Sequence, residues 1–314
     1  MVNHTFRPGA VWLDTSGEPI HAHSGGMFYE HGVYYWYGTH MGAGKTGNLA
    51  EVGIVCYRST DLYNWENVGV ILPVVRDIPG HDLTVGCRLE RPKIVFNDRT
   101  RQYVLWFHLV ESGHGHESAW AGIAVSDYIT GPYRYLKKIH PAGFDVRDMT
   151  LYKDGDGAVY LFYAAGLGDQ RNNTMHVARL TDNYLAASGE YRAIFPDRFM
   201  EAPALCRWND TYYLIASGCT SWDPNQARAA RAPHPFGPWT ETGDPCEPHP
   251  AEDSLLTYHS QSSYIFPVAN RPGAFILMAD RWNPQNHIDG RHVWLPVFIE
   301  NNRLVLRWYP EWCS

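Results

Sequence analysis

Polar residues recur at one position of a pattern that repeats along this chain, and three of them are acids. Carboxyl groups that share a partly dehydrated pocket cannot all ionise, so at least one keeps its proton near neutral pH. A protonated carboxyl beside a second group that activates water is what the hydrolysis of a glycosidic bond requires. The recurring residues are Ser24 with its neighbour His23, then Glu90, Asp148, Glu201 and Gln261.

A simpler interpretation applies to any one of these acids, since Asp and Glu at the start of a strand are commonly solvated loop residues. The recurrence of polar residues at the same phase of the repeat argues against that interpretation for the set. Arg91 directly follows Glu90, and we expect its guanidinium to pair with a carboxylate and fix its orientation.

The repeat that places these residues consists of a short apolar strand, a turn and a Tyr-rich or apolar strand. It occurs five times, and the polar markers are separated by 66, 58, 53 and 60 residues. Gly, Asn and Asp dominate the turns, and apolar residues tend to alternate, so helix is expected to be scarce. The repeats cover residues 25–38, 91–108, 148–165, 202–218 and 262–280.

Further strands follow each repeat, so each unit is interpreted as a four-stranded sheet. A spacing near 50–60 residues is typical of propeller blades. The sequence therefore predicts an all-β fold, a five-bladed β-propeller with four-stranded blades around a central axis. A two-sheet sandwich is the structural alternative, but it does not explain why polar residues recur at one phase. Residues 1–314 are expected to form a single catalytic domain without a separate carbohydrate-binding module.

The composition excludes several classes of protein. The chain has 314 residues, a net charge of −7 and 45% hydrophobic residues. With a mean hydropathy of −0.35 and no apolar run near the ~20 residues of a bilayer span, no membrane partner is expected. The acidic balance also predicts no nucleic-acid partner.

Without a recognisable signal peptide the chain as written is expected in the cytoplasm, or outside the cell if a native N-terminus was removed. The six cysteines are expected as mostly buried free thiols.

Flat aromatic side chains suggest a polar, ring-shaped ligand. Trp36 and Trp106 lie within strands and are interpreted as core, whereas Trp222 and Trp282 lie in loop-like segments that could present rings to a sugar. The run at 42–46, GAGKT, lacks the first Gly of a phosphate loop and is followed by a strand pattern rather than a helix, which argues against nucleotide binding.

The histidine pairs of the sequence are weak evidence for a metal site. His21 and His23, His114 and His116, and His81 beside Asp82 have ligand-like spacing without a clear third partner, and are interpreted as ordinary or substrate-contacting histidines. No metal or other cofactor is required by the chemistry. The axial channel of a propeller leaves room for a structural cation or an ordered water.

Six motifs, in order through most of the chain, resemble those of glycoside hydrolase family 43, whose members are five-bladed propellers that hydrolyse glycosides with inversion. The resemblance is greatest to its exo-β-1,3-galactanase-like subfamilies. The motifs are HAHSGGMFYEHGVYYWYG, ERPKIVFN, RDMTLYKDGDG, EAPALCRWNDTYYLIASGCTSWDPN, SQSSYIF and ADRWNPQNHIDGRHVWLPV.

This resemblance implies roles for individual residues. Glu201 would be the general acid, and Asp148 would raise its pKa and orient it. Many members carry a base Asp on the first blade, where this chain reads HAHSGG; Glu90 is therefore favoured as base or water-orienting group, with Gln261 positioning the water. The residues expected to contact substrate are His23, Ser24, Arg91, Thr220, Trp222, Arg281 and Trp282.

Two departures leave the sugar open. Thr39 and His40 follow YYWYG where an acidic residue is usual, and residues 113–121, GHGHESAWA, stand where an aromatic contact is expected. The expected activity is exo-acting release of a terminal galactose-type sugar from an oligosaccharide or polysaccharide. A β-galactofuranosidase or an α-L-arabinofuranosidase on the same site is the alternative. The missing first-blade Asp also keeps a non-catalytic sugar-binding propeller open. Oligomeric state is not indicated.

Overall fold

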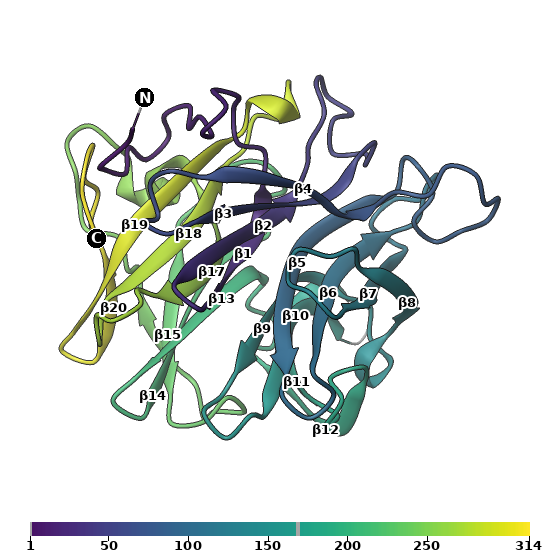
Figure 1. Ribbon diagram of the computed structural model, residues 1–314. Coiled ribbons are helices and arrows are strands. Elements are labelled where there is room, and N and C mark those ends of the chain that lie inside the picture. Colours follow the sequence, from purple (N-terminus) through teal and green to yellow (C-terminus); the bar gives the residue numbers. More distant parts are fainter. Residues whose placement is uncertain (1, 168–169) are drawn as a thin grey trace.

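Five separate four-stranded antiparallel sheets surround a common axis in the computed structural model, which describes residues 2–167 and 170–314 (Figure 1). This arrangement confirms the propeller prediction and excludes the sandwich. Helix within the described residues is confined to three 3-10 segments: η1 (Pro141–Gly143), η2 (Ser254–His259) and η3 (His287–Asp289).

The strands of each sheet follow one another in sequence order, so every blade is a meander. Blade 1 contains β1 (His23–Glu30), β2 (Val33–Thr39), β3 (Gly53–Ser59) and β4 (Glu66–Pro73). Blade 2 contains β5 (Arg88–Asn97), β6 (Gln102–Val110), β7 (Ala119–Ser126) and β8 (Arg134–Ile139). Blade 3 contains β9 (Arg147–Lys153), β10 (Val159–Leu167), β11 (Gln170–Leu180) and β12 (Ala187–Ile194). Blade 4 contains β13 (Met200–Trp208), β14 (Thr211–Gly218), β15 (Arg228–Ala232) and β16 (Thr240–Gly243). Blade 5 contains β17 (Gln261–Pro267), β18 (Phe275–Arg281), β19 (Arg291–Glu300) and β20 (Arg303–Leu306).

The ring closes between the first and last blades. The inner strands β1, β5, β9, β13 and β17 each contact the inner strands of both neighbouring blades, and β17 contacts β1. Trp36 and Trp294 belong to one buried cluster that blades 1 and 5 share. The backbone N–H of Phe6 donates to the carbonyl of Trp312 at 2.8 Å, which ties the two ends of the chain together. The closure is therefore made by packing and by the terminal segments, because each sheet contains only consecutive strands.

A bulge interrupts every inner strand near its start. Register shifts occur within 23–26, 90–93, 147–150, 201–204 and 262–264. In four blades the bulge holds a non-glycine residue in the left-handed region: Ser24 (φ 50°), Arg91 (φ 54°), Asp148 (φ 41°) and Ala202 (φ 54°). Such conformations cost about 1–3 kcal/mol each and are concentrated at functional sites. Bulges redirect side chains, and here they do so at the same end of all five inner strands.

The polar markers thus lie inside the inner strands, within their first three residues, rather than just before them. The expectation for the aromatic core is confirmed, since Trp36 and Trp106 are fully buried. The free-thiol expectation is confirmed as well: four cysteines are buried, Cys219 is half-buried and Cys313 is exposed. Among the described helices, none has the length and apolar character needed to cross a membrane.

Candidate active site

A cavity of about 300 Å³ lies where the five inner strands begin. Each inner strand contributes at least one wall residue. Residues at equivalent positions of the five repeats therefore lie close together in space, as the sequence predicted. The wall is formed by Ser24, Met41, Glu90, Arg91, His108, His116, Arg147, Asp148, Asn172, Glu201, Cys219, Ser221, Trp222, Gln261 and Trp282.

A larger cavity of about 940 Å³ is lined by the opposite ends of the inner strands. Its carboxylates are Glu30, Asp98 and Asp127, of which the two aspartates are exposed and Glu30 accepts a hydrogen bond from Tyr103. Neither aspartate is desolvated, whereas Glu90 and Glu201 of the smaller cavity are buried. We therefore place the chemistry in the smaller cavity.

Glu201 is the buried acid of this cavity. Burial, followed by the negative charge of Asp148, raises its pKa to about 8. Asn172 Nδ2 donates to Glu201 Oε2 at 2.8 Å and Gln261 Nε2 donates to Oε1 at 3.3 Å. These bonds favour the ionised form but do not outweigh the first two effects. Glu201 consequently holds a proton at neutral pH, as a general acid must.

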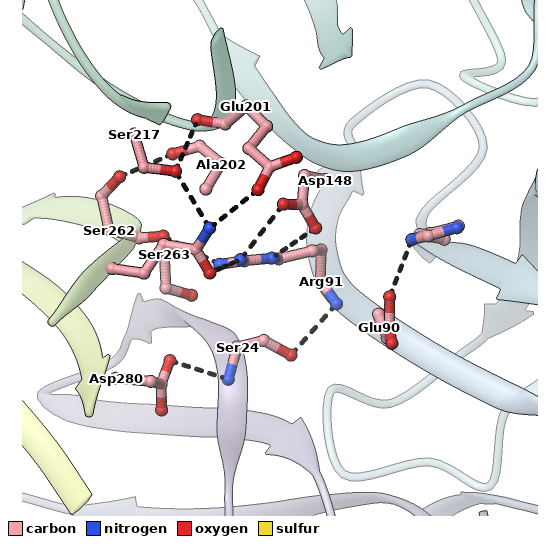
Figure 2. A network of polar contacts seen from close by, with 12 residues as sticks. Ser24, Glu90, Arg91, Asp148, Glu201, Ala202, Ser217, Ser262, Ser263 and Asp280 are labelled. Atoms are coloured by element: carbon pink, nitrogen blue, oxygen red, sulfur yellow. Dashed lines mark hydrogen bonds and ion pairs between the residues drawn. The ribbon is translucent and has the colours of Figure 1, made fainter. Parts of the chain in front are cut away.

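Asp148 lies beside Glu201 in the cavity wall and is bound by Arg91. Arg91 Nε donates to Asp148 Oδ1 at 3.0 Å and Nη2 faces Oδ2 at 3.4 Å (Figure 2). The Arg91 side chain is 4% exposed, and buried charge-assisted pairs of this kind fix orientation. The pairing expected for Arg91 is thus present, with Asp148 as the partner.

Gln261 differs from its expected role. Its Oε1 accepts from Arg91 Nη2 at 2.6 Å and from Trp282 Nε1 at 2.9 Å. Its Nε2 donates to Glu201 and, at 2.9 Å, to Ser217 Oγ. An amide has two acceptor lone pairs and two donors, and all four are used by protein groups. Gln261 therefore binds and orients the Glu201 carboxyl, and its four bonds leave the amide no free position for a water.

Glu90 lies on the β5 wall of the cavity, and His108 is its cross-strand partner on β6. His108 Nδ1 lies 3.0 Å from Glu90 Oε2. Burial raises the pKa of Glu90, but the hydrogen bond and charge of His108, with smaller contributions from His116 and Arg91, bring it down to about 2. Two carboxyl groups of the same cavity are thus driven to opposite protonation states, the pattern that separates an acid from a base.

Trp222 and Trp282 form an aromatic wall of the cavity. Their rings meet edge to face, with centroids 5.3 Å apart and planes inclined at 76°. The Trp282 indole also donates to Gln261, so the wall is tied to the acid. The loop tryptophans therefore occupy the positions that the sequence predicted, at the cavity.

Three of the predicted contact residues lie outside the cavity wall. His23 is fully buried with Nδ1 3.4 Å from Asp280, so it supports the strand that carries Ser24. Thr220 is exposed, and its hydroxyl donates to the carbonyl of Asp223 within the same loop. Arg281 donates to Glu252 and to the carbonyl of Tyr258. Direct substrate contact is therefore not supported for these three, since protein groups occupy their side chains.

Other wall residues were missed as members of the site. His108 could have been found as the single histidine within the apolar run YVLWFHLV. The structure pairs it with Glu90 across strands β5 and β6. Asn172 and Cys219 carry little signal, because their role depends on contact with Glu201 and with each other; Asn172 Nδ2 lies 3.2 Å from Cys219 Sγ. His116, proposed as a substrate-contacting histidine, does line the cavity.

Within the part of the chain that the structure describes, two groups of side chains are close enough to hold a metal ion: His23 with Asp280 and His292, and Glu90 with His108 and His116. In each group a histidine nitrogen already faces the carboxylate, at 3.4 Å and 3.0 Å respectively. A hydrogen bond between His23 and Asp280 and an ion pair between His108 and Glu90 account for these distances without a metal ion.

One protonated and one ionised carboxyl group in the same cavity are the pair that glycoside hydrolases use. Comparison with known proteins agrees, because the family model "Glycosyl hydrolases family 43" matches residues 23–259. The chain belongs to this family, whose members act on glycosidic bonds.

Solved structures of the family are closely similar. A β-1,3-galactosidase bound to galactodeoxynojirimycin has a TM-score of 0.91 and 36% identity, over 98% of this chain and 100% of the other. An exo-β-1,3-galactanase from Phanerochaete chrysosporium, bound to β-1,3-galactotriose, has a TM-score of 0.88 and 29% identity, over 99% of this chain and 68% of the other. A xylan 1,3-β-xylosidase from a Vibrio species is 25% identical over 254 residues, which is 77% of this chain and 44% of the relative. This chain therefore spans less than half of that curated relative.

Proposed function

We propose that this protein is an exo-acting, inverting glycoside hydrolase that releases a terminal β-1,3-linked galactose. The observation that carries the proposal is the pair formed by Glu201, with a pKa of about 8, and Glu90, with a pKa of about 2, in one cavity. The choice of galactose is supported by the similarity to the β-1,3-galactosidase and to the exo-β-1,3-galactanase. A cavity of about 300 Å³ suits a single terminal sugar better than an internal stretch of chain.

In the proposed reaction Glu201 gives its proton to the glycosidic oxygen as the bond to the anomeric carbon breaks. A water on the opposite face of the sugar attacks that carbon and loses its proton to Glu90. The products are a free sugar with inverted configuration and the shortened alcohol, and the two carboxyl groups have exchanged protonation states. Solvent exchange then restores Glu201 and Glu90 for the next turnover.

The rim does not by itself point to a furanose. Thr39, which replaces the usual acidic residue, is 2% exposed and its hydroxyl donates to the carbonyl of Leu89. It therefore serves the packing of blade 1 against blade 2 instead of facing a sugar. The absence of the acidic residue is therefore no evidence for a furanose, and galactopyranose stays the proposed substrate.

The test is hydrolysis of β-1,3-galactobiose and of the p-nitrophenyl β-galactopyranoside, β-galactofuranoside and α-L-arabinofuranoside, with the first-formed anomer read by proton NMR. We expect galactobiose and the galactopyranoside to be cleaved, with α-galactose appearing first. Preference for either furanoside would replace the substrate assignment, and no cleavage of any compound would favour the sugar-binding alternative. Near-normal turnover by Glu90→Gln, with loss in Glu201→Gln, would remove Glu90 from the role of base.

A further inference from the structure

The axial channel next to the catalytic cavity contains a buried lysine that the reaction does not use. Lys93 follows Arg91 by two residues on β5 and is 1% exposed. Its Nζ donates to the backbone carbonyls of Ser24 at 3.1 Å, Gly25 at 3.0 Å and Pro92 at 3.2 Å. Carbonyl oxygens arranged in this way around one point form the kind of cage that usually binds a hard cation.

The number of acceptors matches the protonated side chain. An ammonium group has three N–H donors, whereas a neutral amine has two donors and a lone pair that would face a carbonyl. Burial and then the Arg91 guanidinium hold the pKa of Lys93 well below its ordinary value, and the carboxylates of Asp280 and Asp148 offset this only in part. The assignment of an ammonium therefore rests on the three carbonyl acceptors around Nζ. The Tyr264 ring, whose centroid lies 5.9 Å from Nζ, adds a favourable cation–π contact.

The cage is connected to the catalytic residues through Ser24. The Ser24 N–H donates to Asp280 Oδ2 at 3.0 Å, and Ser24 Oγ accepts from the N–H of Arg91 at 3.1 Å (Figure 2). Both Ser24 and Arg91 are in the left-handed conformation of their bulges, which needs support from their surroundings. Lys93 supplies that support by binding the carbonyl of Ser24.

From Arg91 the connection reaches Glu201 through one intermediate residue. The Arg91 guanidinium binds Asp148 and Gln261, the two residues that hold Glu201 protonated and oriented. Blade 5 joins the same network, since Ser263 Oγ donates to the Gly25 carbonyl at 2.7 Å. A shift of the Ser24–Gly25 segment would therefore reach Glu201 through three successive contacts, by way of Arg91 and Gln261.

We propose that the Lys93 ammonium is a built-in cation of the axial channel, occupying a carbonyl cage where a separate ion would otherwise bind, and that it is a positioning residue for Arg91. The cage becomes a binding site for a small alkylammonium ion once the side chain is removed. The effect on turnover rests on the proposed hydrolase function, whereas the binding of an alkylammonium ion does not.

The experiment compares Lys93→Ala with and without n-propylammonium, which replaces the missing carbons and the ammonium group. We expect turnover of the best glycoside to fall at least about tenfold with a smaller change in KM, because about 1.4 kcal/mol of lost positioning corresponds to that factor. Millimolar n-propylammonium should restore several-fold of the lost turnover and raise the melting temperature of the variant. n-Butanol, a neutral molecule of similar size, should do neither.

Two further variants separate positioning from loss of bulk. Lys93→Met keeps most of the volume, so it should lose turnover and should not be rescued. Lys153→Ala is the control, because Lys153 Nζ also binds a carbonyl, that of Phe96, together with Asp98, and lines the larger cavity instead of the catalytic one. It should respond to neither additive. Absence of both rescue and stabilisation in Lys93→Ala, or full turnover in Lys93→Met, would overturn the proposal.

The proposal stays testable if Lys93→Ala does not fold. The chain has five lysines, so lysine labelled with ¹⁵N at the side-chain nitrogen gives a short list of signals in the wild type. The other four are assigned by single substitution. We expect the remaining signal to be an ammonium that exchanges slowly with solvent at pH 7; a neutral amine would contradict a built-in cation.

Discussion

Gln261 donates its side-chain amide to Glu201 Oε1 at 3.3 Å, and the oxygen of the same amide accepts from Arg91 and Trp282. Glu201, the proposed general acid, is therefore oriented by a residue of the neighbouring blade that is itself fixed on both sides. Because the donors Arg91 and Trp282 can only face an oxygen, they determine which way the amide points. The nitrogen must then face Glu201 and Ser217.

Replacing the acid should separate protonation of the leaving group from binding. Glu201→Gln keeps the size of the side chain but cannot give up a proton, so kcat for galactobiose should fall about 10³-fold, with KM changed little. A dinitrophenyl galactoside needs little protonation of its leaving group and should lose much less. The measurement is kcat for both substrates; equal losses would contradict the assignment of Glu201 as acid.

Asp148 should set the basic limb of the pH profile. Because its charge raises the pKa of Glu201, wild-type kcat/KM should fall as pH rises through about 8, where the acid loses its proton. Asp148→Asn removes that charge, lowers the pKa of Glu201 and should move this limb to lower pH. A limb that stays in place in Asp148→Asn would show that Asp148 does not act through the acid.

His108 should set the acidic limb of the pH profile of kcat/KM, because it lowers the pKa of Glu90. Its hydrogen bond and charge lower the pKa of Glu90, so His108→Gln should raise that pKa and leave Glu90 protonated at higher pH. Activity should then be lost earlier as pH falls, measured as kcat/KM between pH 3 and 7. The exposed His4 offers a control, since His4→Gln should leave the limb unchanged.

Much of this architecture could be predicted from the sequence because it repeats. Turn residues at Asn209 and Asp210 separate strands that do pair as a hairpin, and five such hairpins predict five blades. Glu90, Asp148 and Glu201 could be brought together without coordinates, since equivalent positions of inner strands converge on the axis. Periodicity thus supplies long-range contacts that a single motif cannot.

The contacts made by individual atoms could not be predicted in the same way. The sequence indicates that Gln261 is in the site, but its four hydrogen bonds depend on groups from two other blades and its own, two of them, Arg91 and Glu201, redirected by bulges. His23, Thr220 and Arg281 were expected at the sugar because they adjoin site residues. A strand turns neighbouring side chains to opposite faces, and His23 lies behind Ser24 for that reason.

Tryptophans of the rim and of the core should respond differently to truncation. Trp222→Ala should raise KM about tenfold, since the loss of one aromatic face corresponds to roughly 1.4 kcal/mol, with a small change in stability. Trp106 is fully buried, and Trp106→Ala should cost about 3–5 kcal/mol of unfolding free energy. Urea unfolding and steady-state kinetics on both variants check this; a stable Trp106→Ala would contradict its place in the core.

The raised pKa of Glu201 also predicts how stability depends on pH. Below about pH 4.5 both the folded and the unfolded chain carry the proton, so this residue costs nothing. Between about 4.5 and 8 the unfolded chain releases the proton while the folded protein retains it, so its contribution to folding becomes steadily less favourable as pH rises. At pH 7 the cost is roughly 3 kcal/mol, taking about 1.4 kcal/mol per pKa unit.

Glu201→Gln has no proton to lose and therefore does not carry this cost in folding free energy. Its melting temperature should therefore exceed that of the wild type by several degrees at pH 8, with the difference shrinking toward pH 4.5. Calorimetry across this range is the measurement, with the exposed Glu18→Gln as the control for losing one carboxylate. A difference that does not change with pH would show that the acid is not held protonated in the folded protein.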